Sequence, residues 1–311
     1  MTQLTNLSNV PLAMAVFLAS DSYDYDPAPK TISVTTLMKP VRQIIMQARA
    51  AMMPNTVPPD IMDRAANRLG SSLHDAIERV WKDRASMTGS LLRLGYPASL
   101  IQRIQINPTD EYLENNPNTI PVYMEQRERK QVGSWTVTGK FDFVAEAQVQ
   151  DFKSANVLSY QKQRNAEKQA MQGSLYRWLN PKKITKDKMI IMHFFVDWSK
   201  AMAKAGANNN YPPNRVMRQE LDLKSVNEVD VYVLNKLALI DKYWDADEED
   251  IPECNEEDLW RNLPVFKYYK KGKANQARST KNFEDRTEAY VFFSEQGGVG
   301  ELHEVPGLVK A

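Results

Sequence analysis

"GKFDFVAEAQVQDFKSA", residues 139–155, places two aspartates and a lysine on a predicted tight β-hairpin. Apolar and polar residues alternate on both sides of the short turn "AEAQ", which is typical of a β-hairpin packed against a core. Successive side chains of a strand point to opposite faces. We therefore expect Lys140 and Asp142 to share one face of the first strand. Asp151 and Lys153 should share one face of the second strand, close to Asp142.

This polar face combines two carboxylates with an amine, and the opposite face carries Phe141, Phe143 and Phe152. Charges beside a core are costly to desolvate, and Asp142 and Asp151 repel one another unless a positive charge lies between them. Carboxylate oxygens suit Mg²⁺ or Mn²⁺. A lysine beside a metal and a phosphate can orient a water and stabilise negative charge. The alternative is an ordinary Asp–Lys salt bridge on a solvated strand face.

Further strands and helices are predicted around the hairpin. The predicted strands span 121–132, 134–145, 148–155 and 189–199, the last being a near-continuous apolar run of the kind buried on both faces. The predicted helices span 60–85, 160–180 and 225–245. Together they predict an α/β fold with a mixed central sheet flanked by helices, a helical N-terminal part and a C-terminal extension.

Composition excludes some classes of protein. The chain has 311 residues, enough for about two domains, and 40 basic against 39 acidic residues give a net charge of +1, which neither favours nor excludes nucleic acid. The single cysteine, Cys254, excludes an internal disulfide and a four-cysteine metal or iron–sulfur cluster. The apolar stretch 10–19 is too short for a membrane span, which needs about 20 residues. We therefore predict a soluble, cytoplasmic protein with no membrane partner.

Two helical segments carry further polar residues. His74 lies in "NRLGSSLHDAIERVW" (67–81), near serines that could cap a helix, although a lone histidine is more often a packed or surface residue. Along 160–180, polar residues recur every four positions, which places them on one helix face. The members of this stripe are Tyr160, Arg164, Lys168, Gln172 and Tyr176. The alternative is an ordinary solvated face.

Four short motifs follow one another along the chain: Gly70-Ser-Ser-Leu-His74, Gly139-Lys-Phe-Asp142, Asp151-Phe-Lys153 and Gln172-Gly-Ser-Leu-Tyr176. In order and spacing they resemble the G-x-x-x-H, G-x-x-D, (D/E)-x-K and Q-x-x-x-Y motifs of the PD-(D/E)XK nuclease superfamily. The similar branch includes the RecB nuclease domain, CRISPR-adaptation nucleases and phage exonucleases. The resemblance covers about residues 32–200 and implies a restriction-endonuclease-like core.

The resemblance also implies roles for single residues. The metal ligands would be His74, Asp142, Asp151 and the backbone carbonyl of Phe152, and Lys153 would be the catalytic lysine. Gln172 and Tyr176 would support the site and the adjoining DNA backbone. Relatives often carry an acidic residue on the strand "VYMEQRERK", where Glu125 is the candidate and Glu128 the competing choice. His193 and His303 match no motif and are interpreted as structural.

The function implied is Mg²⁺- or Mn²⁺-dependent hydrolysis of linear duplex or single-stranded DNA. An exonuclease in phage-type recombination or replication, with partner proteins of those processes, is favoured. The alternatives are a structure-specific endonuclease and an inactive DNA-binding module. The predicted organisation is a lead-in segment at 1–30, a nuclease core at 31–200 and an extension at 201–311 packed on the core. Close relatives often hold an iron–sulfur cluster, which this chain cannot form.

Basic segments suggest where DNA would lie, because phosphate neutralisation dominates DNA affinity. From residue 153 to residue 188 there are nine basic residues and two acidic ones, and Arg164 and Lys168 are the predicted DNA contacts among them. The segment "FKYYKKGKANQARSTKNF" (266–283) adds Lys270, Lys271 and Lys273, with aromatic residues that could stack on bases. The alternative for this segment is a solvated hairpin.

Overall fold

The computed structural model describes residues 3–20, 28–53, 58–205, 210–255, 258–259, 264–272 and 278–307. The chain divides into two compact units, one formed by residues 1–38 and 47–242 and the other by residues 39–46 and 243–311. Across the described residues, no helix combines the length and apolar character that crossing a membrane requires.

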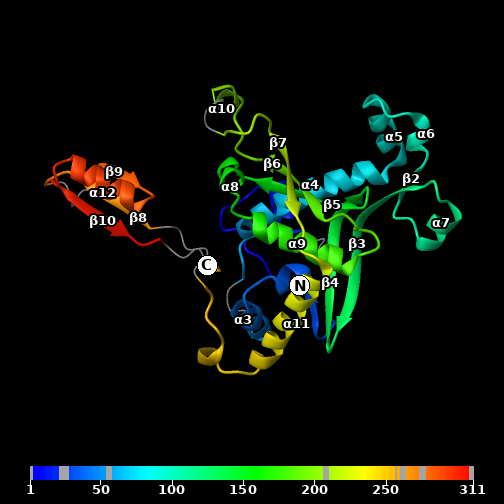
Figure 1. Ribbon diagram of the computed structural model, residues 1–311, viewed down its shortest axis with the longest axis horizontal. Helices are drawn as coiled ribbons and strands as arrows, with labels where there is room; N and C mark the ends of the chain where they lie inside the picture. The colour runs from blue at the N-terminus through cyan, green and yellow to red at the C-terminus, as the bar shows by residue number, and fades with distance from the viewer. Residues whose placement is uncertain are drawn as a thin grey trace. The chain divides into compact units, whose positions relative to one another are not determined.

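The first unit is built on a mixed sheet (Figure 1). Its strands are β1 (Thr31–Ser33), β2 (Ile104–Ile106), β3 (Ile120–Val132), β4 (Trp135–Ala145), β5 (Gln148–Ala155), β6 (Lys188–Phe195) and β7 (Val216–Asp222). The order is β2-β3-β4-β5-β6-β7, with β1 paired to β4. The β1–β4, β2–β3 and β5–β6 pairs are parallel and the others antiparallel. β7 belongs to the same sheet although it lies beyond residue 200, the predicted end of the core. The predicted domain limits stay a prediction.

Most helices of the chain belong to the first unit. They are α1 (Leu12–Ala19), α2 (Val34–Leu37), α4 (Ala65–Lys82), α5 (Arg84–Arg93), α6 (Ala98–Ile101), α7 (Asp110–Asn115), α8 (Val157–Gln161), α9 (Ala166–Leu179), α10 (Lys200–Ala205) and α11 (Val226–Tyr243). Another helix, α3 (Val41–Met52), is divided between the two units. α4 packs on β5, and α9 crosses β3, β4, β5 and β7. The predicted α/β fold with a mixed central sheet flanked by helices is confirmed, and it is consistent with a restriction-endonuclease-like core.

The predicted hairpin is present as β4 and β5. Its two-residue turn, Glu146 and Ala147, has φ values of 51° and 60°. Positive φ at both central residues is the requirement of a type I′ turn, whose twist matches that of the flanking strands. The turn is also anchored from outside, because the Ala147 carbonyl accepts hydrogen bonds from the backbone N–H groups of Thr185 and Lys186.

Two helix predictions were wrong in detail. The single helix predicted at 160–180 is broken into α8 and α9, and Gln163 in the break has φ of 52°. The residues from Tyr160 to Tyr176 therefore do not form one stripe. His74 is in the middle of α4 and not near a serine cap, since a 3₁₀ turn capped by Asp60 precedes the helix.

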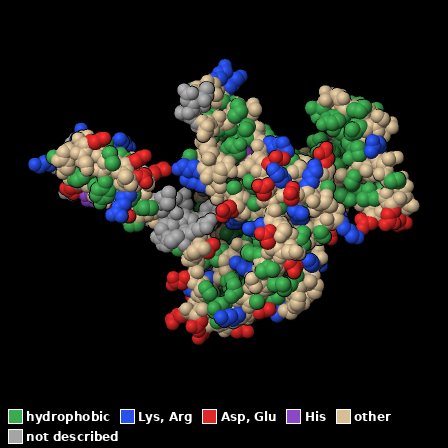
Figure 2. Space-filling view, in the orientation of Figure 1, with side chains coloured by type: hydrophobic (Ala, Val, Ile, Leu, Met, Phe, Trp, Pro, Cys, Tyr) green, Lys and Arg blue, Asp and Glu red, His purple; other side chains and the backbone are tan. Residues whose placement is uncertain are grey.

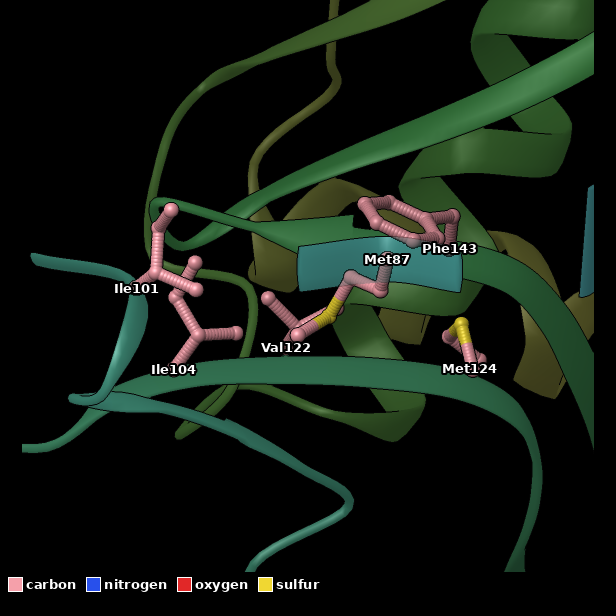
Figure 3. Packing of buried hydrophobic residues seen from close by; sticks show 6 residues of the cluster. All are labelled: Met87, Ile101, Ile104, Val122, Met124 and Phe143. Carbon is pink, nitrogen blue, oxygen red and sulfur yellow. The ribbon is translucent and has the colours of Figure 1, made fainter. Parts of the chain in front are cut away.

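A buried apolar cluster joins the α5–α6 region to the sheet (Figure 3). Its members are Met87, Ile101, Ile104, Val122, Met124 and Phe143. Trp81 and Phe152 pack against it, and the Trp81 and Phe143 rings meet edge to face at 4.9 Å. Because Met124 and Phe143 are direct neighbours of Glu125 and Asp142, charged groups here border an apolar interior.

The second unit contains a small sheet and a helix. They are β8 (Val265–Tyr269), β9 (Lys281–Phe283), β10 (Glu301–Val305) and α12 (Arg286–Glu295), with the strand order β10-β8-β9. Phe266, Tyr268 and Phe283 are buried together with Ala289. These three rings form a core, so the prediction that they stack on bases was wrong. Lys270 and Lys271 are exposed, and Lys273 lies outside the described residues.

Candidate active site

Asp142 and Asp151 lie where the β4–β5 ladder ends. The last paired residues are Phe143 and Gln150, and the two aspartates are the next residues on their strands. Beyond this point β5 continues beside β6, whereas β4 continues beside β1. The Phe152 backbone N–H donates to Asp142 Oδ2 at 3.4 Å across the fork. The prediction that the turn brings the two carboxylates together is confirmed.

Three side chains from three elements converge beside this fork. His74 comes from α4, Glu125 from β3 and Asp142 from β4. One potential ligand atom of each lies within 4.8 Å of the others, a spacing that could hold a metal ion. The His74 Nδ1 to Asp142 Oδ2 distance is 3.2 Å. Each of the three is partly buried, so each is held in place yet still reachable.

The backbone explains how Glu125 reaches this group. Its φ is 51°, in the left-handed region that non-glycine residues seldom adopt. Glu125 lies opposite Asp142, between the paired residues Met124 and Gln126. Met124 and Glu125 are consecutive, yet both line the small pocket that contains His74 and Asp142. The regular alternation of the strand is interrupted here, and strained backbone of this kind is often found at functional sites.

The two glutamates left open by the sequence lie in different surroundings. Glu128 Oε1 pairs with Lys183 Nζ at 2.6 Å and is absent from the His74–Asp142 pocket. Glu125 Oε2 pairs with Lys140 Nζ at 2.5 Å while remaining part of the ligand group. The geometry therefore favours Glu125.

Asp151 and Lys153 form a second pair within the fork. Lys153 Nζ lies 2.7 Å from Asp151 Oδ2, and Asp151 is only 2% exposed. The Lys153 ammonium is therefore the polar partner of this buried oxygen, although the angles of the contact fall outside hydrogen-bond geometry. Carboxylate oxygens also suit a divalent cation.

Burial and mutual charge set the protonation of this cluster. Burial, together with the charge of Asp142, raises the pKa of Asp151 to about 8. Burial also acts to raise the pKa of Asp142, but hydrogen bonds from His74 and Asp151 outweigh it and hold that pKa below its usual value. Burial opposes charge on His74 and Lys153 as well, yet the carboxylates outweigh it and raise both pKa values. Asp151 is thus the more readily protonated of the two carboxyls, and a divalent cation would displace that proton.

Gln172 and Tyr176 lie on α9 and contact one another. Gln172 Nε2 donates to the Tyr176 hydroxyl at 2.8 Å, and Tyr176 is 5% exposed. α9 approaches β4 closely at Gly139, where the Cβ of any larger residue would lie 2.7 Å from Leu179 and 2.8 Å from Val34. Only glycine fits at this position without displacing its neighbours, which explains the glycine of the G-x-x-D motif.

Other predicted residues are not part of the cluster. Arg164, in the segment between α8 and α9, and Lys168, on α9, are exposed. On the face drawn in Figure 2, basic and acidic side chains of the first unit are interspersed. His193 is 4% exposed and bonds Gln219, and His303 pairs with Glu301 at 3.0 Å, both consistent with their interpretation as structural.

Sequence reasoning missed Glu78. This residue is one turn after His74 on α4 and lines the same small pocket. Its charge contributes, after burial and the charge of Asp142, to raising the pKa of Glu125. The four-residue spacing from His74 places both on one helix face, and that spacing could have identified it.

The donor set fits a divalent cation. It combines one imidazole nitrogen with carboxylate oxygens of Glu125 and Asp142, next to Asp151, whose Oδ2 contacts Lys153. Carboxylate-rich sites suit Mg²⁺ and Mn²⁺, while imidazole is commoner with later transition metals. The chemistry of the site therefore accommodates the predicted class of metal without selecting one ion.

Comparisons with known proteins give limited information. No protein-family description and no curated protein matches the chain. A structure titled "Crystal structure of SSO0001" is 16% identical with a TM-score of 0.39, the match covering 70% of this chain and 79% of that one. A phage-related exonuclease from Haemophilus somnus 129PT is 13% identical with a TM-score of 0.27, covering 52% of this chain and 80% of that one. Such TM-scores establish no shared architecture.

Proposed function

We propose that this protein is a metal-dependent deoxyribonuclease of the PD-(D/E)XK superfamily. The observation that carries the proposal is the convergence of His74, Glu125 and Asp142 within 4.8 Å, beside the Asp151–Lys153 pair at the fork of β4 and β5. A cation site and an amine next to each other are what phosphodiester hydrolysis needs, since charge develops on phosphate oxygens and a water must be activated.

Each residue has a distinct role in this proposal. His74, Glu125, Asp142 and Asp151, with the Phe152 carbonyl, would hold Mg²⁺ or Mn²⁺, which when bound supplies a Lewis acid for the phosphate. Lys153 would orient the attacking water and stabilise negative charge on the phosphate. Lys140, paired with Glu125 at 2.5 Å, would hold that carboxylate in position. Gln172 would fix Tyr176 next to β4, where α9 supports the fork.

An exonuclease acting in phage-type recombination or replication is the favoured form of this activity. It is supported by the motif resemblance alone. The competing forms are a structure-specific endonuclease and an inactive DNA-binding module, and the intact ligand group with its lysine argues against the inactive one. DNA contacts by Arg164, Lys168, Lys270, Lys271 and Lys273 belong to the same proposal.

One assay separates these forms. End-labelled linear duplex and covalently closed circular DNA would be incubated with the protein in Mg²⁺, in Mn²⁺, and in excess chelator. An exonuclease shortens the linear DNA only, an endonuclease also opens the circle, and an inactive module binds without cutting. Cleavage should stop in chelator and return when metal is restored. Cleavage that continues in chelator would contradict the metal site.

A further inference from the structure

A second, larger pocket opens beside Lys153. Its volume is about 360 Å³, within the range of small-ligand sites, and all residues that line it are described and belong to the first unit. Five carboxamide side chains line it: Asn156, Gln163, Asn165, Gln169 and Gln219. Lys153 is the only lysine or arginine among its lining residues, and no carboxylate lines it. This environment is polar but nearly uncharged.

One wall of the pocket is held by a relay of side chains. Gln219 Nε2 donates to Gln163 Oε1, so Gln219 Oε1 accepts from His193 Nε2 at 2.7 Å. Gln163 has φ of 52°, in the break between α8 and α9. The Tyr160 ring meets the His193 ring edge to face at 5.0 Å. The relay fixes the break between the helices against the sheet.

The relay leaves one polar atom without a partner. Because His193 donates through Nε2, its Nδ1 is a bare acceptor, and this atom is buried with no hydrogen-bond partner among the described residues. His193 is 4% exposed and lines the pocket. This atom is closed off from the pocket as well as from solvent, so the polar contacts open to a ligand are those of the carboxamides and Lys153.

The chemistry of the wall selects the ligand class. Carboxamides each offer both donors and an acceptor, which matches the mixed edges of nucleobases. A pocket for an isolated phosphate would need several cationic partners, and Lys153 is the only lysine or arginine among the residues that line this one. We propose that this pocket receives one unpaired nucleobase of the DNA strand that is cut.

The position of the pocket relates the base to the reaction. Lys153 and His193 are register partners on the adjacent parallel strands β5 and β6, so their side chains lie on the same side of the sheet. The base would belong to a nucleotide next to the scissile phosphate, a placement that rests on the proposed function. A base can enter such a pocket only when it is outside the duplex, so the preferred substrate is a single-stranded or frayed segment.

Binding to single-stranded oligonucleotides tests this proposal without cleavage. Fluorescein-labelled strands carrying one abasic residue at successive positions would be titrated in chelator, which prevents cutting. Loss of the bound base should weaken binding about tenfold at one position. The double variant Gln169→Leu/Asn165→Leu changes two side chains that line the pocket outside the relay. In this variant, the affinity for the strand that is abasic at that position should differ by less than about twofold from the affinities for strands abasic at neighbouring positions. Gln102→Leu, which does not line the pocket, should retain the wild-type pattern.

The outcomes keep this proposal separate from the nuclease assignment. If the wild-type protein binds every strand of the abasic series with the same affinity, the base pocket is overturned. It is also overturned if the folded double variant still distinguishes one abasic position from the others. If discrimination is present but no DNA is cut in Mg²⁺ or Mn²⁺, the pocket stands and the nuclease assignment fails. If DNA is cut but binding does not depend on the abasic position, the nuclease assignment stands and the base pocket fails. If a free deoxynucleoside monophosphate binds as tightly as the oligonucleotide, the pocket is a site for free nucleotides, and the proposal that it receives a base of the DNA strand is overturned.

Discussion

The hydroxyl of Tyr176 accepts a hydrogen bond from Gln172 Nε2 at 2.8 Å inside the protein, with Tyr176 only 5% exposed. The sequence places both residues on a polar helix face, but the structure shows that the tyrosine is part of the packed interface of α9. Its ring contributes to stability, and its hydroxyl to the position of Gln172.

Tyr176→Phe should lower nuclease activity and cost about 1 kcal/mol of unfolding free energy, since one hydrogen bond is lost while the ring is kept. Tyr176→Ala should cost about 3–5 kcal/mol, because a cavity is left. Urea denaturation of both variants, beside nuclease rates, measures these effects. A cost for Tyr176→Phe as large as that for Tyr176→Ala would show that the hydroxyl, and not the ring, maintains the packing.

Two motif glycines should respond in opposite ways to alanine. Gly139→Ala forces a methyl group to 2.7 Å from Leu179 and 2.8 Å from Val34, and overpacking of this kind costs about 1–3 kcal/mol. At Gly70, within α4, the nearest atom would be Ser154 Oγ at 3.9 Å. Gly70→Ala should therefore stabilise the protein by about 0.5–1 kcal/mol. Thermal and urea unfolding of the matched pair tests this, and equal effects would contradict the close approach of α9 to Gly139.

Stability should depend on pH through His193. Burial lowers its pKa, aided by the charge of Lys153 and opposed by the Gln219 hydrogen bond. The unfolded chain, with an ordinary pKa of about 6.5, binds the proton more readily than the folded protein. The contribution of His193 to the free energy of unfolding should therefore fall as pH drops below about 6.5, by at most about 1.4 kcal/mol per pH unit, while the raised pKa values of Asp151 and His74 act in the opposite direction. Urea denaturation between about pH 7.5 and 5.5 measures it.

The matched controls for this prediction are two histidine variants. Relative to the wild type, His193→Asn should gain stability as pH falls, because it lacks this contribution. His303→Asn, which changes an exposed histidine, should keep a constant difference in stability from the wild type. If both variants behave alike, His193 is not the residue responsible.

Much of the fold could be predicted because the relevant signals are local. The strands at 121–132 and 148–155 follow from alternation and turn residues, and they agree with β3 and β5 to within a residue at each end. The break between α8 and α9 could not be predicted, because Gln163 adopts φ of 52° there and its side chain bonds Gln219, a residue far away in the sequence.

The site was predictable only in part for the same reason. Asp142, Asp151 and Lys153 follow from a hairpin and its period of two. The choice of Glu125 over Glu128 depends on a left-handed residue that reverses the expected alternation, and no residue type in "VYMEQRERK" signals it. Burial of Tyr176 likewise depends on how α9 packs on β4, which the helical period alone cannot decide.

The central claim is that Lys153 acts on the reaction while Asp142 holds the metal. Metal titration by calorimetry, beside hydrolysis of linear duplex, would compare Lys153→Ala, Asp142→Ala and the exposed control Lys182→Ala. Lys153→Ala should bind metal nearly as the wild type does, while hydrolysis falls about 100-fold or more. Asp142→Ala should lose both, and DNA binding should survive in each. Wild-type turnover in Lys153→Ala would show that Asp151 and Lys153 form an ordinary salt bridge and would contradict the account.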